Sequence, residues 1–182
     1  MGTIKTTNIE PIADNGTVTL GSSGDTFSLG SGVVQSNLMY PAFFAHSASD
    51  QTGLPDNTYT KVTLGTEVYD TDSVFADSRF TVPTDKAGKY FLYGSVKCKT
   101  SSNSDLANAY SAIYLNGSRY LENRMNFTSN SVRLSTNLIH VTLDLSVGDY
   151  VELYGAVDSG SSSREFGASE KATNFGAYRI GS

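Results

Sequence analysis

The side chains that most often carry out chemistry are few in this sequence. There is one cysteine, Cys98, and there are two histidines, His46 and His140, which lie far apart along the chain. They cannot supply the four ligands of a structural zinc site, and a single cysteine cannot form an internal disulfide. No Gly-x-Ser-x-Gly nucleophile turn and no glycine-rich phosphate or dinucleotide motif is present. We therefore expect no catalytic residues and a protein that is not an enzyme.

Closely spaced carboxylates occur in one short stretch. Asp70 and Asp72 are separated by a single threonine, and Asp77 follows. Carboxylate oxygens in a loop are ligands that calcium prefers, so Asp70 and Asp72 are the metal-ligand candidates of the sequence. The alternative is that they are solvated acids of a turn, in which case no cofactor is expected.

Composition excludes several classes of protein. Charged residues make up 17% of the 182 residues, compared with about 25% in a typical soluble domain. A net charge of -5 and an isoelectric point near 4.9 argue against a nucleic-acid partner. No apolar stretch reaches the roughly 18 residues of a membrane span, so we expect no membrane insertion. The abundance of tyrosine, serine and threonine is typical of exposed β-sheet.

Alternating apolar and polar residues predict strands along most of the chain. In 132–145, for example, Ile139, Val141 and Leu143 share one face, with His140 on the other. Asn116-Gly117 between two such runs predicts a hairpin turn. No stretch shows a helical period with caps, so an all-β sandwich or jelly roll is expected. The predicted strands are 40–46, 60–69, 78–82, 89–98, 108–115, 118–122, 132–145, 149–157 and 173–180.

The first 36 residues differ from the rest. Two short alternating runs, 17–20 and 26–29, are each followed by glycine and serine, which predicts two short strands joined by turns. Their apolar side chains are too few to form a core within one chain. We therefore interpret residues 1–36 as a β-segment that winds with copies of itself or attaches to a partner, and residues 37–182 as a head domain. A flexible Gly/Ser linker is the alternative for the first segment.

A series of motifs follows the order found in one protein family. It begins with Pro41-Ala42-Phe43-Phe44-Ala45 and continues with Phe80-Thr81-Val82-Pro83 and Gly88-Lys89-Tyr90-Phe91. Gly148-Asp149-Tyr150-Val151 and Asn174-Phe175-Gly176 follow. In these motifs residues 40–182 resemble the globular heads of the complement C1q family, which are ten-stranded jelly rolls related to tumour necrosis factor. The resemblance implies a jelly-roll β-sandwich that forms a homotrimer, with three copies packed around an axis through aromatic strand faces.

Several aromatic side chains are expected on strand faces that one sandwich cannot bury. Within 89–98, alternation places Phe91 and Tyr93 opposite Tyr90, and Tyr154 falls on the polar side of its own strand. Contiguous aromatic side chains at a surface indicate an interface, and ordinary exposed tyrosines are the alternative. The predicted trimer-interface residues are Phe91, Tyr93, Tyr110, Tyr114, Tyr154 and Phe175.

Long polar loops are expected at 99–108, 122–131 and 158–172. Two of them combine arginine with an aromatic residue, and that combination suits contact with carbohydrate or protein. Plain connecting loops are the alternative. The predicted receptor-binding residues are Arg124, Phe127, Arg164 and Phe166.

The N-terminal segment carries a second resemblance. Residues 17–32 look like the short segments that precede head domains in tail-fibre and virion proteins of tailed phages. This implies a non-enzymatic structural protein on the virion surface, either a fibre knob or a capsid-decoration trimer. Its implied partners are copies of itself, other virion proteins bound through the N-terminal segment, and a host surface glycan or protein. The alternative is a secreted C1q/TNF-like trimeric ligand-binding protein of a cellular organism, although no secretion signal is visible in the polar start of the sequence.

Overall fold

The computed structural model describes residues 39–127, 132–160 and 163–181, together with Thr19, Gly21, Ser23, Asp25, Thr26 and Ser31. Contacts divide the chain into two compact units, Met1–Ser36 and Asn37–Ser182. Apart from Thr19 and Thr26, the predicted strands 17–20 and 26–29 lie outside the described residues, so they stay predictions.

The regular secondary structure of the second unit is almost entirely β-strand. Among the described residues the only helix is a short 3-10 turn, Ser169–Lys171. The prediction of an all-β chain without a long helix is therefore confirmed. The strands are β1 (Ala42–His46), β2 (Gln51–Thr52), β3 (Thr60–Lys61), β4 (Thr66–Asp70), β5 (Phe75–Ala76), β6 (Arg79–Thr81), β7 (Gly88–Thr100), β8 (Leu106–Leu115), β9 (Ser118–Asn126), β10 (Leu134–Leu145), β11 (Tyr150–Ser159), β12 (Arg164–Phe166) and β13 (Asn174–Gly181).

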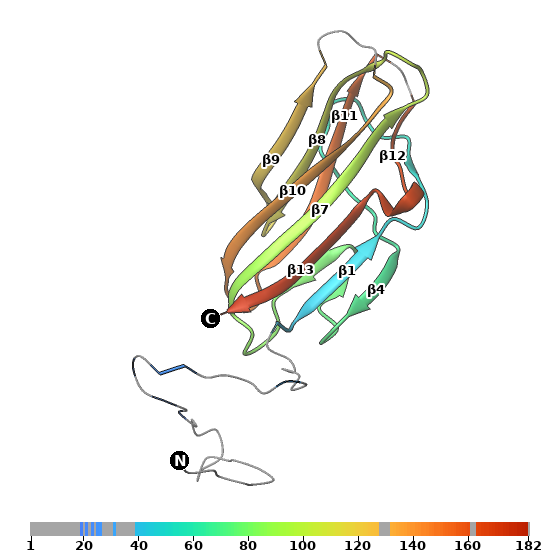
Figure 1. The fold of residues 1–182 in the computed structure, drawn as a ribbon. Coiled ribbons are helices and arrows are strands. Elements are labelled where there is room, and N and C mark those ends of the chain that lie inside the picture. The colour runs from blue at the N-terminus through green and yellow to red at the C-terminus, as the bar shows by residue number, and fades with distance from the viewer. Residues whose placement is uncertain are drawn as a thin grey trace. The chain divides into compact units, whose positions relative to one another are not determined.

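The strands form two antiparallel sheets (Figure 1). Sheet A has the order β2-β12-β7-β13-β1-β4. Both β12 and β13 pair with the same edge of β7, and β10 pairs with its opposite edge. Sheet B has the order β5-β6-β11-β8-β9, and β3 pairs with β11. Two antiparallel sheets with this crossing order confirm the predicted jelly-roll β-sandwich.

The predicted strand 60–69 is two strands in the structure, because the chain changes sheets within it. β3 pairs with β11 in sheet B, and the amide of Val62 donates a hydrogen bond to the carbonyl of Leu153, 2.9 Å away. β4 then pairs with β1 in sheet A. The alternation in the sequence continues across this change of sheet, so it did not reveal the break.

The centre of sheet A is the long strand β7. One edge of β7 pairs with β10 over its whole length, and the other edge pairs first with β13 and then with β12. Its inward side chains, among them Tyr90, Leu92 and Val96, are completely buried. Phe91 and Tyr93 lie between them in sequence, so the pleat turns both toward the outer face of the sheet, as predicted.

The core between the sheets is rich in phenylalanine. Phe43 of β1 stacks on Phe75 with ring centroids 4.4 Å apart and on Phe80 at 5.4 Å, and it meets Phe175 edge-on at 5.2 Å. These four rings come from both sheets, so the cluster joins the two layers of the sandwich at one end.

The turn between β8 and β9 is the predicted Asn-Gly hairpin. Asn116 and Gly117 both have positive φ, 50° and 80°, as the two central residues of a type I′ turn require. Asn116 also links this turn to β11, because its side-chain oxygen accepts a hydrogen bond from the amide of Tyr150 at 2.9 Å. The turn therefore fixes the register of the hairpin within sheet B.

Candidate functional site

The outer face of sheet A carries a continuous group of aromatic side chains. Phe91 and Tyr93 point outward from β7, and pairing places Tyr178 of β13 opposite Phe91. Two strands further on, Phe44 of β1 is paired with Tyr69 of β4. Paired residues point to the same face of a sheet, so these rings come together. We call Phe44, Tyr69, Phe91, Tyr93, His140 and Tyr178 the aromatic row.

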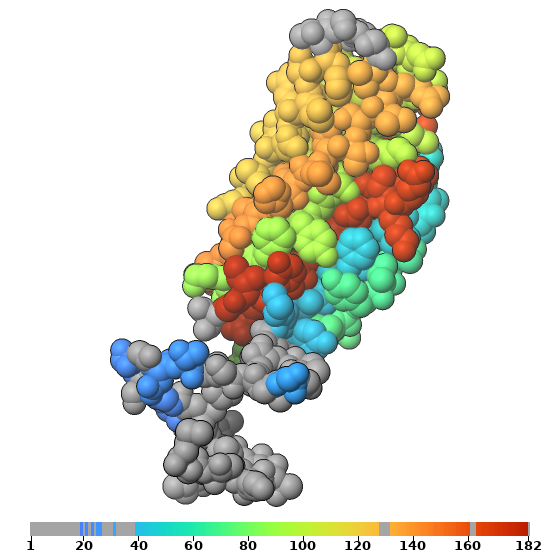
Figure 2. Space-filling model, in the orientation of Figure 1, coloured from blue at the N-terminus to red at the C-terminus, as the bar shows by residue number. Residues whose placement is uncertain are grey.

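The rings of the aromatic row contact one another across the sheet. The distances between ring centroids are 5.5 Å for Phe91–Tyr178, 6.0 Å for Phe91–Tyr93, 6.1 Å for Phe91–His140, 6.2 Å for Phe44–Tyr93 and 6.4 Å for Phe44–Tyr69. Figure 2 shows this side of the head, where side chains of β1, β7 and β13 adjoin one another. In Figure 1 no other described element lies in front of β7, β13 and β1.

Gly176 provides the space in which Tyr93 lies flat on the sheet. A Cβ atom at this position would lie 2.5 Å from Cζ and Oη of Tyr93 and 3.0 Å from the carbonyl oxygen of Phe43. Burial raises the pKa of Tyr93, and a hydrogen bond with Tyr69 raises it further. The Tyr93 hydroxyl is therefore neutral at any physiological pH. The ring lies over Gly176, and the hydrogen bond with Tyr69 fixes its hydroxyl.

The outer face of sheet B carries a separate aromatic group. Tyr114 of β8 stacks on Tyr154 of β11 with centroids 3.9 Å apart. Tyr59, just before β3, lies edge-on to Tyr110 at 5.6 Å and 6.3 Å from Tyr114. The Tyr59 hydroxyl donates a hydrogen bond to Glu122 of β9. Burial and this hydrogen bond raise the pKa of Tyr59.

The structure divides the predicted trimer-interface residues among three places. Phe91 and Tyr93 lie in the aromatic row, whereas Tyr110, Tyr114 and Tyr154 lie on the opposite side of the sandwich, on sheet B. Tyr110 is also only 7% exposed, beneath Tyr59. These five residues therefore lie on two faces of the head, and their role in a trimer interface stays a prediction.

Phe175 is not an interface residue, and that prediction is wrong. Its side chain is completely buried against Phe43 in the core. In β13 the outward residues include Gly176 and Tyr178, because they pair with the outward Tyr93 and Phe91 of β7. Tyr178 therefore takes the surface position that was assigned to Phe175.

Phe166 is not a receptor-binding loop residue, because it is part of the core. It belongs to β12, is paired with Cys98 of β7 and is completely buried. Gly155 of β11 leaves room for its ring, since a Cβ there would lie 2.8 Å from two ring carbons of Phe166. The short strand β12 thus inserts an aromatic side chain between the sheets.

The other three predicted receptor-binding residues differ in exposure. Phe127 is half-buried and packs against the core. Arg164 is 14% exposed in its side chain, and its Nε lies 2.8 Å from a carboxylate oxygen of Asp56. The contacts of Phe127 and Arg164 therefore stabilise the fold, and neither side chain is fully exposed on a loop. Arg124 is exposed on β9, beside Tyr110, and its binding role stays a prediction.

The carboxylate of Asp70 is engaged by backbone amides of its own turn. The two carboxylate oxygens of Asp70 accept hydrogen bonds from the amides of Val74 and Phe75, each at 3.0 Å. Asp72 is exposed in the same turn. No group of three or more His, Cys, Asp or Glu side chains within the described part of the chain is arranged to hold a metal ion. Asp70 is thus engaged in holding the turn between β4 and β5.

Replacing Asp70 by alanine should lower the free energy of unfolding by about 1–2 kcal/mol, because two partly buried amides lose their acceptor. Urea denaturation measures this, and Asp72→Asn is the matched control, with an expected change within about 0.5 kcal/mol. Millimolar calcium should leave the melting temperature unchanged. A calcium-dependent rise that Asp70→Ala abolishes would show that the turn binds the metal after all.

Glu152 of β11 is the centre of an ion-pair cluster on sheet B. Its side chain is 4% exposed, and one oxygen lies 2.7 Å from Nζ of Lys61 and 2.9 Å from Nε of Arg79. Burial by itself would raise the pKa of Glu152, but the hydrogen bonds from Lys61 and Arg79 outweigh it, so the pKa is lowered. The carboxylate is therefore charged in the folded state and holds β6 and β3 to β11.

The Glu152 cluster should make the head less stable in acid. A carboxyl group whose pKa is lower when folded stabilises the fold above its unfolded pKa, and this contribution is lost as pH falls through the folded value. The melting temperature of Glu152→Gln should therefore fall less between pH 6 and pH 3 than that of the unaltered chain. The control is Glu67→Gln on the exposed side of β4, which should follow the unaltered chain. Parallel melting curves for all three would contradict the assignment.

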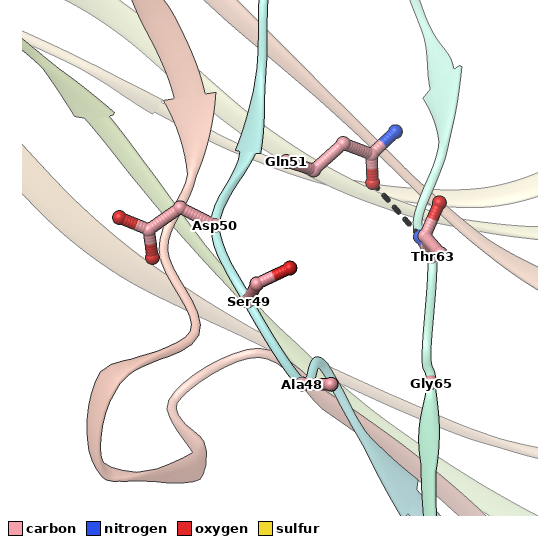
Figure 3. A pocket seen from close by; sticks show the side chains of 6 residues that line it. All are labelled: Ala48, Ser49, Asp50, Gln51, Thr63 and Gly65. Carbon is pink, nitrogen blue, oxygen red and sulfur yellow. Dashed lines mark hydrogen bonds between the residues drawn. The ribbon is translucent and has the colours of Figure 1, made fainter.

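A pocket lies beside the β1–β2 connection (Figure 3). Its volume is about 340 Å³. Gln51 forms a fixed wall, because its amide donates to the Lys61 carbonyl at 2.9 Å and accepts from the Thr63 amide at 2.8 Å. Asp50 points away from Gln51 in Figure 3 and pairs with Lys99. The lining residues, Ala48, Ser49, Asp50, Gln51, Thr63 and Gly65, include none of the predicted site residues.

Four members of the aromatic row were not predicted as interface residues: Phe44, Tyr69, His140 and Tyr178. Phe44 follows the buried Phe43 directly, and strict alternation along β1 could have placed it outward. Tyr69 could not have been found in this way, because a bulge in the β1–β4 pairing falls between Phe44 and Ala45.

No helix in the described part of the chain is long and apolar enough to cross a membrane.

Comparison with known proteins gives evidence at the level of the fold. No protein-family model matches the sequence, and no curated protein matches it. The structure is similar to the globular domain of the zebrafish complement 1qA protein, with a TM-score of 0.53 and 16% identity, covering 77% of this chain and 97% of that one. It is also similar to murine APRIL in crystal structures at pH 5.0 and pH 8.0, each with a TM-score of 0.55, 12% identity, and 76% and 98% coverage. The head therefore has a C1q/TNF-like jelly-roll fold.

Proposed function

We propose that the head forms a homotrimer through the aromatic row and is displayed, without catalytic activity, as a structural protein of a phage virion. The observation that carries the proposal is the continuity of the aromatic row on the outer face of sheet A. Exposed and half-exposed rings in contact across neighbouring strands form the kind of patch that marks a protein interface. Tyr69 at one end of the row is 45% exposed.

A ring of three copies needs two different surfaces on each copy, because a threefold axis brings unlike patches together. The second surface is an edge patch on β9 and β10. Its exposed residues include Tyr120 at 56% and Leu138 at 69%. The two strands are linked there, since Nδ2 of Asn123 donates to the carbonyl of Leu138 at 2.7 Å. In the proposed trimer the edge patch of one copy, formed by Tyr120, Met125, Leu134 and Leu138, packs against the aromatic row of the next.

The proposed place of the trimer is the virion surface, as a fibre knob or a capsid decoration. The support is the resemblance of residues 17–32 to segments that precede head domains in phage virion proteins. In this proposal residues 1–36 attach the trimer to other virion proteins, and the heads face outward. Three heads on one axis contact a host surface together, so weak single contacts add through their effective concentration.

Electron microscopy of particles labelled with antibody against the head tests the virion proposal. Label on the capsid or tail is the expected result, and its position separates decoration from fibre. Purified particles that contain no such chain by mass spectrometry would overturn the virion assignment while leaving the trimer to be tested by sedimentation.

The similarity to a zebrafish complement domain and to murine APRIL favours a second candidate. In that candidate the chain is a secreted, trimeric ligand-binding protein of a cellular organism. The genes on either side discriminate the two: neighbouring capsid or tail genes favour the phage protein, and a cellular neighbourhood favours the secreted one.

A further inference from the structure

Three arginine side chains lie against tyrosine rings on the outer face of sheet B. The guanidinium carbon of Arg79 is 4.1 Å from the centroid of the Tyr150 ring. Arg119 lies over Tyr59 at 4.6 Å, and Arg124 over Tyr110 at 5.5 Å. We call Arg79, Arg119 and Arg124 with these three tyrosines the arginine face. A guanidinium held by a ring keeps the N–H groups in its own plane available for hydrogen bonds.

Each arginine is also fixed along one edge by a polar partner. Nε of Arg79 lies 2.9 Å from the Glu152 carboxylate, and Nη1 of Arg119 lies 3.0 Å from that of Glu122. Nε and Nη2 of Arg124 both donate to Oδ1 of Asn108, at 3.1 and 2.9 Å. A guanidinium has five N–H donors, so each keeps further donors beyond these contacts. The stacking and the edge contacts together hold the three groups in fixed orientations.

The cations of this face are more exposed than the acids that hold them. The side chain of Arg79 is 44% exposed and that of its partner Glu152 only 4%. The side chain of Arg119 is 46% exposed, against 32% for Glu122. Asp158, near the end of β11, is half-buried and accepts a hydrogen bond from Asn108. A ligand that approaches sheet B therefore meets arginine before it meets carboxylate, although the chain as a whole carries a net charge of -5.

We propose that the arginine face binds a polysaccharide whose sugars carry carboxylates. The planar donor edge of arginine matches the two oxygens of a carboxylate, and a linear polymer presents such groups at intervals along an extended face. Tyr154 and Tyr114 lie between Arg79 and the other two arginines and offer ring edges and hydroxyls to sugar. The inference rests on the proposed function for the outward display of the head, and it adds the class of ligand that the head contacts.

Binding of the full chain to immobilised polygalacturonate tests the proposal. The unaltered chain should bind polygalacturonate and should not bind its methyl ester, in which the backbone is unchanged and the carboxylates are masked. Because the attraction is between charges at an exposed surface, 0.5 M sodium chloride should weaken binding severalfold. Replacing Arg79, Arg119 and Arg124 by glutamine should reduce binding at least tenfold.

Two control variants separate this site from a general charge effect. Replacing Lys86, Arg133 and Lys171 by glutamine removes as many positive charges as the arginine variant does, but these three residues lie outside the arginine face. This variant should bind like the unaltered chain. Lysine at the three arginine positions keeps the charge but loses the planar fork, so it should bind several times more weakly. Equal losses in the two glutamine variants, full binding by the lysine variant, or equal binding of the ester would each overturn the proposal.

Folding and assembly are checked for every variant by melting temperature and sedimentation. Arg119 and Arg124 lie on β9 next to Tyr120 and Met125 of the edge patch, so sedimentation first establishes that each variant keeps the oligomeric state of the unaltered chain. Loss of binding by a folded variant with unchanged sedimentation supports the site. Absence of polygalacturonate binding by the unaltered chain removes the ligand assignment and leaves the trimer and virion proposals standing.

Discussion

A chain that carries Phe91→Ser and Tyr93→Ser should sediment as a monomer at micromolar concentrations at which the unaltered chain is expected to sediment as a trimer. The two rings occupy the middle of the aromatic row and contact Phe44, Tyr178 and His140. Aromatic residues at the centre of an interface often contribute ~2 kcal/mol or more each, so losing two weakens association by roughly a thousandfold. Analytical ultracentrifugation measures the change.

The matched control removes two aromatic residues from the other face. Tyr114→Ser with Tyr154→Ser deletes a stacked pair on sheet B, whose centroids are 3.9 Å apart, and should leave the trimer intact. If this variant dissociates and the Phe91→Ser, Tyr93→Ser variant stays trimeric, the interface lies on sheet B. A monomeric unaltered chain would refute self-association altogether. Melting curves for both variants show whether each still folds.

Replacing Phe43 by alanine should lower the free energy of unfolding by about 3–5 kcal/mol, a large part of the roughly 5–15 kcal/mol that stabilises a typical domain. The ring is completely buried and contacts Phe75, Phe80 and Phe175. Alanine leaves a cavity where strands of both sheets meet, and the neighbouring rings cannot fill it without leaving their own positions. Urea denaturation followed by circular dichroism gives the value.

The control for Phe43 is Val147→Ala in the turn between β10 and β11. Val147 is 51% exposed, so its truncation should change the free energy of unfolding by less than about 0.5 kcal/mol. A loss below about 1 kcal/mol for Phe43→Ala would mean that the phenylalanine cluster is not the joint between the sheets. Sedimentation of both variants keeps the effect on folding separate from the effect on assembly.

The longer strands could be predicted because each repeats its alternation several times. β10 shows this clearly: Ile139, Leu143 and Leu145 are buried, and His140 and Asp144 are exposed. β2, β5 and β12 have only two or three residues each. So short a run contains too little alternation to be distinguished from a loop. It forms a strand only because its backbone pairs with the edge of a neighbouring strand.

The candidate site was harder to predict than the fold, because alternation assigns a face of a strand but not the sheet to which the strand belongs. Phe91 and Tyr114 both point outward, yet they lie on opposite sides of the sandwich. Phe175 was assigned to the surface by an error of phase within β13, and the pairing of Tyr178 with Phe91 gives the correct phase. Tyr59 reaches Tyr110 from a distant part of the chain, and no local pattern indicates this contact.

The position of β13 imposes an order of events during synthesis. β13 lies between β7 and β1 and pairs with both, so before it is made sheet A consists of two separate parts, β1 with β4 and β7 with β10. Sheet B contains no residue beyond β11 and can form earlier. Phe44 and Phe91 come onto one surface only when β13 joins their strands. The nascent chain on the ribosome therefore presents no complete aromatic row, and assembly of the proposed trimer waits until translation has passed β13.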